Sequence, residues 1–361
     1  MFVRNAYIKN FRNIDFINAD FSKGHNIFLG NNGEGKTNLL EAIFFSCMNR
    51  SFRTRIISEL KNNAKSKESD NRIYTKTDID YGNFSRQVEN CVDGRKRTIK
   101  VDNVEESSEY LIDNNNFVTF VPDDLKILKN DPVYRRKFLN EICSQIFPGY
   151  YKNLIKYRKI LNNRNCLLKN NKPFELWDDL LIECAQFILA KRSECIDFLK
   201  KTIPISYSKL SSGKEIVEIE YKGDFNISKQ DLKESKYNDI KNGYTCIGPH
   251  RDDIIMRINK NEFRKTASQG QFRTAVFALK MAQADILWKI KKDRPVIILD
   301  DVFSELDRER KQKLLKFLEG IYQTFISSNY LEDEILEKMT EKKIFFIREG
   351  RFEKERVFQT K

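Results

Sequence analysis

The chain has 361 residues, which is enough for one large domain with an insertion or for two domains. Hydrophobic and charged contents of 40% and 32% fit a folded protein, and we find neither a signal peptide nor a run of about 20 apolar residues, so we expect a cytoplasmic protein with no membrane partner. The net charge of +13 favours a polyanionic partner, although Lys and Asn are abundant throughout the chain.

The first third of the chain reads mainly as strands. Apolar and polar residues alternate from Phe2 to Phe21, which predicts paired strands, and the apolar strand Ile27-Phe28-Leu29 leads into a glycine-rich loop. From Lys36 onward, apolar residues recur at helical spacing. Residues 71–101 alternate again and predict an antiparallel meander, with a hairpin turn at Asp93-Gly94.

The middle of the chain changes character after Pro122, where the pattern becomes helical and charged. Pro132 is well placed to begin a helix. The spacing of apolar residues predicts two long amphipathic helices, Leu154 to Leu168 and Leu176 to Leu199, packed as an antiparallel pair. The polar stretch 223–243 is expected to consist of turns and to form a boundary.

The last third returns to alternating helices and strands. We predict a helix over Gln271 to Ile290 and then a buried strand over Val296 to Leu299. A helix capped by Ser304 follows, then a strand at residues 324–326 and a last strand at residues 344–347. The expected domains are an α/β lobe built from residues 1–110 and 244–361, and an inserted helical lobe over residues 111–243.

A phosphate-binding pattern, G-x-x-x-x-G-K-[ST], is matched at every fixed position by Gly30-Asn31-Asn32-Gly33-Glu34-Gly35-Lys36-Thr37. The glycines let the backbone wrap around phosphates and point its N–H groups inward. Lys36 is expected to bind the β- and γ-phosphates, and the Thr37 hydroxyl to bind Mg²⁺. Because a strand precedes this loop and a helix follows it, the eight residues predict an ATP·Mg²⁺ site.

Two carboxylates, Asp300 and Asp301, follow the predicted strand Val296 to Leu299. Acids after an apolar strand are common, and it is the pairing with a phosphate loop that favours a catalytic role. We predict that Asp300 holds Mg²⁺ through its water shell and that Asp301 orients or deprotonates the attacking water. With Lys36, these two acids are the candidate catalytic residues.

The segment Ser268-Gln269-Gly270-Gln271 precedes the long predicted helix. Its plain interpretation is a helix start capped by a serine. A helix N-terminus with a free serine and glycine is also an anion site, able to close on a γ-phosphate from outside.

The order of these motifs resembles the ABC-type ATPases of the SMC class, and in detail the RecF family of bacterial recombination mediators. The resemblance implies an α/β fold, an ABC-type P-loop ATPase head assembled from both chain ends with an inserted, mainly helical lobe. It covers essentially the whole chain and rests, besides the phosphate loop and Ser268-Gln269-Gly270-Gln271, on residues 8–13, 122–125, 135–139, 248–253 and 299–307.

The resemblance also implies that Ser268, Gly270 and Gln271 bind the ATP γ-phosphate of an opposite subunit. ATP binding would then drive a homodimer, with Asp307 at its seam. Arg53 lies where SMC-like heads carry an arginine linked to DNA-stimulated hydrolysis, and a solvated surface arginine is the equal alternative. For His250 we expect a structural role.

Two ABC-type features have no clear counterpart. No glutamine sensor is found at residues 117–124, and Ser327-Ser328 stand in the region of the switch histidine. Slow hydrolysis is the expected consequence, so the resemblance implies a weak, DNA-stimulated ATPase.

The implied partners are DNA, either duplex or at single-strand/duplex junctions such as gaps, and RecO- and RecR-type mediator proteins that help to load the recombinase. The alternative is an ATPase subunit of a nuclease complex, which would need a separate metal cluster of carboxylates or histidines that we do not find in the sequence. A transporter subunit is disfavoured by the charged helical insertion, and a small-molecule kinase by the lack of a substrate lobe.

Overall fold

The computed structural model describes residues 1–62, 71–211, 215–319 and 322–358. The chain forms two compact units, one made of Met1–Asp124 and Leu287–Lys361 and the other of Leu125–Ile286. These unit boundaries differ from those expected from the sequence, since residues 111–124 lie in the first unit and residues 244–286 in the second.

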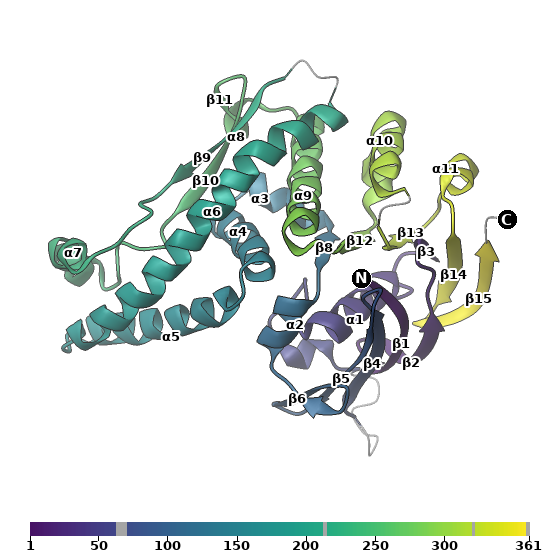
Figure 1. The fold of residues 1–361 in the computed structure, drawn as a ribbon, viewed down its shortest axis with the longest axis horizontal. Coiled ribbons are helices and arrows are strands. Elements are labelled where there is room, and N and C mark those ends of the chain that lie inside the picture. Colours follow the sequence, from purple (N-terminus) through teal and green to yellow (C-terminus); the bar gives the residue numbers. More distant parts are fainter. Residues whose placement is uncertain (63–70, 212–214, 320–321, 359–361) are drawn as a thin grey trace. The chain divides into compact units, whose positions relative to one another are not determined.

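An antiparallel sheet is the first of two sheets in the first unit (Figure 1). Its opening strands pair with each other, and the meander over residues 73–101 has its hairpin turn at Gly94, so both predictions are confirmed. In spatial order the strands are β2 (Ile14–Asp20), β1 (Phe2–Phe11), β4 (Ile73–Asp80), β5 (Ser85–Asp93), β6 (Lys96–Val101) and β7 (Val104–Glu105).

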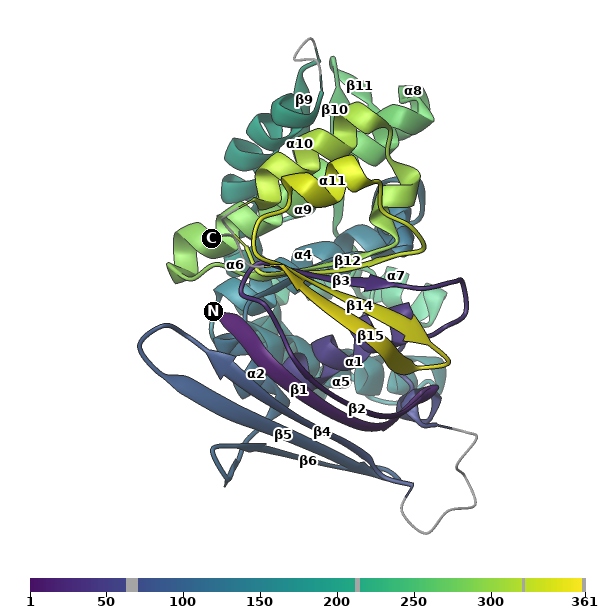
Figure 2. The same ribbon diagram turned by 90° about the vertical axis from the view of Figure 1, so that its right-hand side faces the viewer.

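The second sheet carries the nucleotide motifs and is mostly parallel (Figure 2). Its spatial order is β15 (Arg351–Phe358), β14 (Lys342–Arg348), β3 (His25–Leu29), β13 (Thr324–Ser328), β12 (Val296–Asp300) and β8 (Phe117–Phe120). Only β15 runs antiparallel to its neighbour. The strand predicted at residues 344–347 is confirmed as β14, but it is not the last strand, because β15 follows it.

Helix α1 (Lys36–Met48) packs against both sheets, which explains its apolar sequence. Only Thr37 and Asn38 of its 13 residues are not fully buried. Phe45 packs against Phe11 of β1 at a ring distance of 5.6 Å, and Phe44 packs against Phe117 of β8 at 5.8 Å. This double packing fixes the start of α1, where the phosphate loop ends.

The remaining helices of the first unit are α2 (Ser108–Asn114), α10 (Arg308–Leu318) and α11 (Asp333–Lys338). The prediction that Ser304 caps the helix after β12 is wrong. Residues 302–305 form a short 3-10 helix, and the Ser304 hydroxyl donates to the Asp301 carbonyl at 2.7 Å. Asp307 caps α10 instead, because its carboxylate accepts from the Arg310 N–H at 2.9 Å.

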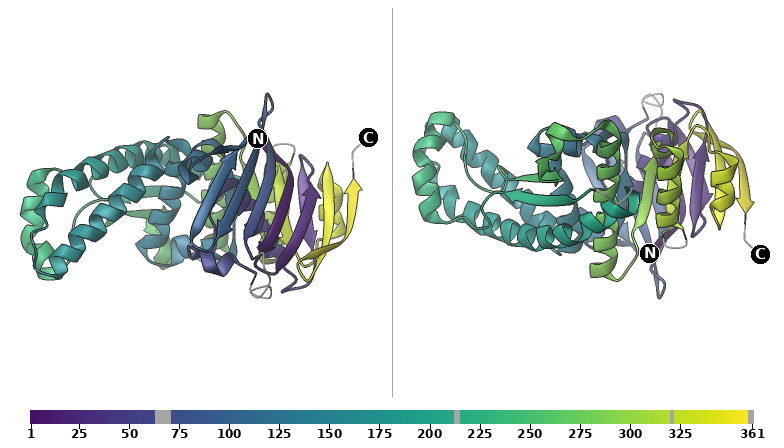
Figure 3. Two further views of the ribbon diagram at one scale, coloured as in Figure 1. Left: turned by 90° about the horizontal axis from the view of Figure 1, so that it is seen from below. Right: turned by 90° about the horizontal axis from the view of Figure 1, so that it is seen from above.

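The second unit is mainly helical and contains the predicted antiparallel helix pair (Figure 3). The pair is α5 (Tyr150–Lys169) and α6 (Asp178–Leu210), and Pro132 begins α4 as predicted. The stretch expected to consist of turns instead contains α7 (Lys229–Asn242), which is capped by Ser228 and Asp231. The other elements are α3 (Lys126–Lys129), α4 (Pro132–Ile146), α8 (Phe263–Thr266), α9 (Gln269–Lys291, whose last turn lies in the first unit), β9 (Val217–Lys222), β10 (Asp253–Ile258) and β11 (Asn261–Glu262).

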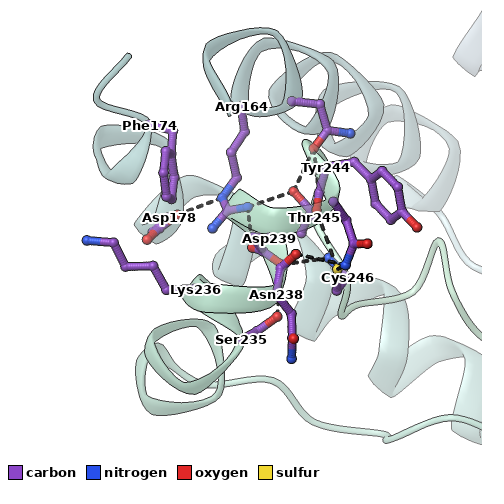
Figure 4. A network of polar contacts seen from close by, with 12 residues as sticks. Arg164, Phe174, Asp178, Ser235, Lys236, Asn238, Asp239, Tyr244, Thr245 and Cys246 are labelled. Carbon is purple, nitrogen blue, oxygen red and sulfur yellow. Dashed lines mark hydrogen bonds and ion pairs between the residues drawn. The ribbon is translucent and has the colours of Figure 1, made fainter. Parts of the chain in front are cut away.

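A fully buried arginine, Arg164 of α5, joins three segments of the second unit (Figure 4). Its guanidinium donates to Asp178 at 2.9 Å, to Asp239 of α7 at 2.7 Å and to the Thr245 hydroxyl at 2.7 Å, and it lies 4.7 Å from the centre of the Phe174 ring. A buried charge is tolerated only when it is paired in this way. The network therefore holds the start of α6, α7 and the segment after α7 together.

The segment 248–253 is also held by hydrogen bonds to buried side chains of the second unit. Arg192 of α6 donates to the Pro249 carbonyl and to Asp252, both at 2.6 Å. The two ring nitrogens of His250 lie 2.6 Å from the Tyr157 hydroxyl and 2.9 Å from the Thr245 carbonyl. Burial lowers the pKa of His250 to about 4, so the ring is neutral at pH 7. The predicted structural role of His250 is confirmed.

Candidate nucleotide-binding site

The phosphate loop runs from the carboxyl end of β3 to the first turn of α1. Gly33 and Gly35 have φ values of +88° and +101°, which favour glycine. A Cβ atom on Gly35 would also lie 2.7 Å from the Asn13 amide nitrogen, so a side chain does not fit there. Asn31, Asn32 and Gly33 are exposed. The loop thus presents exposed backbone at the positive end of a buried helix.

Lys36 points back into this loop. Its Nζ donates to the carbonyls of Gly30 at 2.7 Å and Asn31 at 2.8 Å, and to the side-chain oxygen of Asn329 at 2.8 Å. Burial lowers the pKa of Lys36, and the nearby carboxylates, Asp301 foremost, oppose that shift. The ammonium group is therefore held between the phosphate loop, which follows β3, and Asn329, which follows β13.

Thr37 and Asp300 meet although 263 residues separate them, because the Thr37 hydroxyl donates to Asp300 Oδ1 at 2.7 Å. A second hydroxyl, that of Ser327 at the end of β13, donates to the same oxygen at 2.7 Å. Burial raises the pKa of Asp300, and these two hydrogen bonds act in the opposite direction. The result is a cluster of hard oxygen atoms of the kind that Mg²⁺ prefers.

Asp301 stands next to this cluster in an unusual backbone conformation. Its φ is +51°, and its N–H donates to the Ser327 hydroxyl at 3.0 Å. Its Oδ1 is buried, and no donor among the described residues reaches it. A buried carboxylate oxygen of this kind is available to a ligand or to water.

Glu34 differs from the rest of the loop, because its side chain turns away toward residues 349–350. Its carboxylate accepts from the Glu349 N–H, and its carbonyl accepts from the Gly350 N–H at 2.8 Å. Any contact of Glu34 with phosphate would therefore come from its backbone N–H.

Arg53 is docked on α1 rather than fully solvated. Its guanidinium donates to Asn38 at 2.8 Å and to Glu41 at 3.2 Å. Glu41 is fully buried and also accepts from Arg12 at 2.9 Å. Arg53 is thus linked to the helix that begins at the phosphate loop, while its side chain remains 43% exposed to solvent.

The segment Ser268 to Gln271 lies in the second unit, at the start of α9. The Ser268 hydroxyl accepts from the Gln271 N–H at 3.3 Å, and the Gln271 side chain accepts from the Ser268 N–H at 2.7 Å. This reciprocal cap leaves Ser268 exposed. Gly270 follows in the first turn, where its carbonyl accepts from Thr274 at 2.9 Å.

Ser327 and Asn329 are the site residues whose contacts sequence reasoning missed. The sequence predicted for Ser327-Ser328 only that they stand in the region of the switch histidine. The Ser328 hydroxyl donates to the Tyr330 carbonyl at 2.7 Å, whereas Ser327 and Asn329 contact Asp300 and Lys36. The feature that could have identified these two residues is their position. Both stand at the carboxyl end of a strand that neighbours the strand leading into the phosphate loop, where ligands bind in α/β sheets.

The family model described as RecF/RecN/SMC N terminal domain matches residues 2–352. The DNA replication and repair protein RecF of Clostridium acetobutylicum is 36% identical over 347 residues, which cover 92% of this chain and 94% of that protein. The chain belongs to the RecF family. The RecF protein of Lachnoclostridium phytofermentans is 35% identical over 366 residues, or 98% of this chain and 100% of the relative.

Solved structures agree with the RecF family assignment. The recombination mediator protein RecF with ATP, from the RecFOR pathway, superimposes with a TM-score of 0.86 at 31% identity, covering 99% of this chain and 97% of that one. An Smc head bound to the C-winged helix domain of ScpA gives a TM-score of 0.60 at 15% identity, covering 99% and 98%, and shows the shared fold alone. The predicted ABC-type ATPase fold and the resemblance to the RecF family are both confirmed. None of the helices in the described part of this RecF-family chain is long and apolar enough to cross a membrane.

Proposed function

We propose that this chain is an ATP-switched DNA-binding protein of replication and recombinational repair. ATP and Mg²⁺ would close two copies on DNA, and slow hydrolysis would release it. One observation carries the proposal, the 2.7 Å hydrogen bond that brings the Thr37 hydroxyl to Asp300. The relatives named DNA replication and repair proteins, and the solved RecF structure with ATP, support the same function.

The residues of the first unit would have different roles in binding and hydrolysing the nucleotide. Residues 30–37 surround the phosphates, and Lys36 neutralises their charge. The oxygen atoms of Thr37 and Asp300 suit a hard cation, so these two residues would hold Mg²⁺, which offsets charge on the phosphates when bound. Asp301, whose Oδ1 is buried without a donor among the described residues, would orient or deprotonate the attacking water.

A second copy of the chain would supply the other half of the site. Ser268 is exposed at the N-terminus of the 23-residue helix α9, where the helix dipole attracts anions. Together with Gly270 and Gln271, it would bind the γ-phosphate of the opposite subunit. Asp307, which is exposed where it caps α10, would lie at the seam of this homodimer.

DNA is the partner proposed for the closed dimer, as duplex or as a gap with single-strand/duplex junctions. A cytoplasmic location is proposed with it. The net charge of +13 supports a polyanionic partner. Mediator proteins of the RecO and RecR type would act with it, as the RecFOR pathway named for the solved relative indicates.

The test combines ATP hydrolysis with a measurement of molecular size, each with and without duplex and gapped DNA. The wild type is expected to dimerise with ATP, to hydrolyse it slowly and to be stimulated by DNA. The variant Lys36→Ala should bind ATP about 10–100-fold more weakly, because it loses a charge-assisted contact, and should not dimerise. Lys100→Ala, an exposed lysine on β6, is the control.

Two results would reject the proposal. One is a Lys36→Ala protein that still dimerises and holds DNA in response to ATP. The other is duplex cleavage with Mg²⁺ in the absence of ATP, which would instead favour the nuclease-complex alternative.

A further inference from the structure

Ser327 lies between the two strands that carry the nucleotide motifs. Strand β13 lies between β3, which leads into the phosphate loop, and β12, which ends at Asp300. The parallel register pairs Ser327 with Asp300 across β13 and β12 and with Phe28 across β13 and β3. Ser327 is only 1% exposed, so its hydroxyl must find partners within the protein.

The Ser327 hydroxyl contacts both acids in different ways. It donates to Asp300 Oδ1 at 2.7 Å and accepts from the Asp301 N–H at 3.0 Å. A serine hydroxyl has one donor and two lone pairs, so a single side chain can serve both neighbours at once. Alanine at this position would remove a donor from a buried carboxylate and leave the Asp301 N–H without its acceptor.

Asp301 depends on such support because its backbone conformation is uncommon. A non-glycine residue with a φ of +51° persists only where its surroundings hold it. Its carboxylate Oδ1 is buried, with no donor from the described residues. A small rotation of this backbone would move that oxygen away from the place where a ligand or water meets it.

We infer that Ser327 is a positioning residue of the ATP site, which fixes Asp300 and Asp301 relative to each other. Thr37 is the other hydroxyl donor to Asp300 Oδ1, and it is also the hydroxyl expected to bind Mg²⁺. If Thr37 held the cation, Ser327 would still be available as a donor that orients Asp300. This inference rests on the proposed function, because it assigns Ser327 to the same ATP site.

The test compares Ser327→Ala and Ser327→Thr with the wild type in three measurements: single-turnover ATP hydrolysis, the Mg²⁺ concentration for half-maximal activity, and ATP binding in EDTA. Loss of an outer-sphere hydrogen bond to a metal ligand costs about 10–100-fold in activity or metal affinity. Ser327→Ala should therefore hydrolyse ATP about 10-fold or more slowly and need more Mg²⁺, with ATP binding in EDTA within about twofold of wild type. Ser327→Thr keeps the hydroxyl and should restore most of the rate.

Ser46→Ala is the matched control, because Ser46 is a buried serine of α1 whose hydroxyl has local partners. It donates to the Ile43 carbonyl at 2.8 Å and lies 3.6 Å from the Cys47 sulfur. This variant should hydrolyse ATP like the wild type. Wild-type rate and Mg²⁺ dependence in Ser327→Ala would overturn the role of Ser327 while leaving the proposed function intact. Equal losses in Ser327→Thr and Ser327→Ala would also overturn it, since the hydroxyl would then not be the active group. Failure of the wild type to bind ATP would instead reject the proposed function and this inference with it.

Discussion

At the scale of single residues, the site is organised by hydrogen bonds to two carboxylates that differ in surroundings. Asp300 receives hydroxyl donors from Thr37 and Ser327, whereas Asp301 has a buried Oδ1 that accepts no hydrogen bond from the described residues. Burial raises the pKa of Asp300, whereas the two hydroxyl donors lower it and so favour the ionised form, which suits a cation ligand. An acid with a free acceptor is suited to contacting water. We therefore propose separate tasks for the two adjacent aspartates.

This difference predicts the behaviour of Asp301→Asn. The amide cannot accept a proton from water, and general-base catalysis contributes about 10²–10⁴-fold, so the hydrolysis rate should fall by at least 10²-fold. ATP binding and ATP-dependent dimerisation should persist, and the dimer should live longer. Single-turnover hydrolysis and sizing with ATP check this, with the exposed Asp20→Asn as control. A rate within about threefold of wild type would show that Asp301 is not the base.

At the scale of secondary-structure elements, the Arg164 network replaces the apolar contacts that usually dock a helix. The fully buried residues of α7 are Leu232, Ser235 and Asp239, so a single apolar side chain anchors its 14 residues. Asp239 supplies the buried polar attachment, through Arg164 and through the Cys246 N–H at 2.8 Å, and the ion pairs of Lys229 with Asp179 and of Lys236 with Glu175 are exposed. The position of α7 thus depends on a charge pair.

We predict that Arg164→Ala destabilises the second unit by about 3–5 kcal/mol, the cost of leaving the buried Asp239 without its partner. Hydrogen exchange of the α7 amides should accelerate most, and chemical denaturation gives the loss of stability. Lys156→Ala on the same helix removes an exposed pair with Glu183 and should cost less than about 1 kcal/mol. Equal effects of the two substitutions would contradict a structural role for the network.

The same network explains why α7 was missed from the sequence. Helix prediction relies on apolar residues at helical spacing, and α7 has polar residues on its buried face. Strand β15 was missed for a related reason, because five of its eight residues are charged and it pairs with one neighbour at the edge of the sheet. The phosphate loop and α1 were predictable because strand, glycines, lysine and helix are contiguous in the chain.

Contacts between distant segments set the other limit on prediction. The register that places Ser327 beside Asp300 is a property of two strands more than 20 residues apart, and nothing in either segment specifies it. Strand β8 was assigned to the inserted lobe for the same reason, since only its pairing with β12 brings it into the parallel sheet. Local pattern therefore predicted the candidate ligands of the site, whereas the residues that contact them could be identified only from the fold.

At the scale of the whole molecule, the charge of +13 leads to a prediction about binding to DNA. If a closed dimer neutralises about six to ten phosphates, affinity for duplex should fall by about 10³–10⁵-fold between roughly 50 and 200 mM salt. Titrations of labelled duplex at several salt concentrations, with ATP present, give the slope directly. An affinity for duplex that does not change between these salt concentrations would rule out phosphate contacts as its main source.

The separation of Thr37 from Asp300 by 263 residues also has a consequence for biosynthesis. Ribosomes add about 5–20 residues per second, so a nascent chain carries its phosphate loop for on the order of 13–50 s before Asp300 is made. Strand β13, with Ser327, emerges later still. A growing or released chain that ends before residue 300 therefore holds neither acid and cannot complete the nucleotide site. The proposed nucleotide-driven pairing of two copies would therefore have to wait until translation is nearly over.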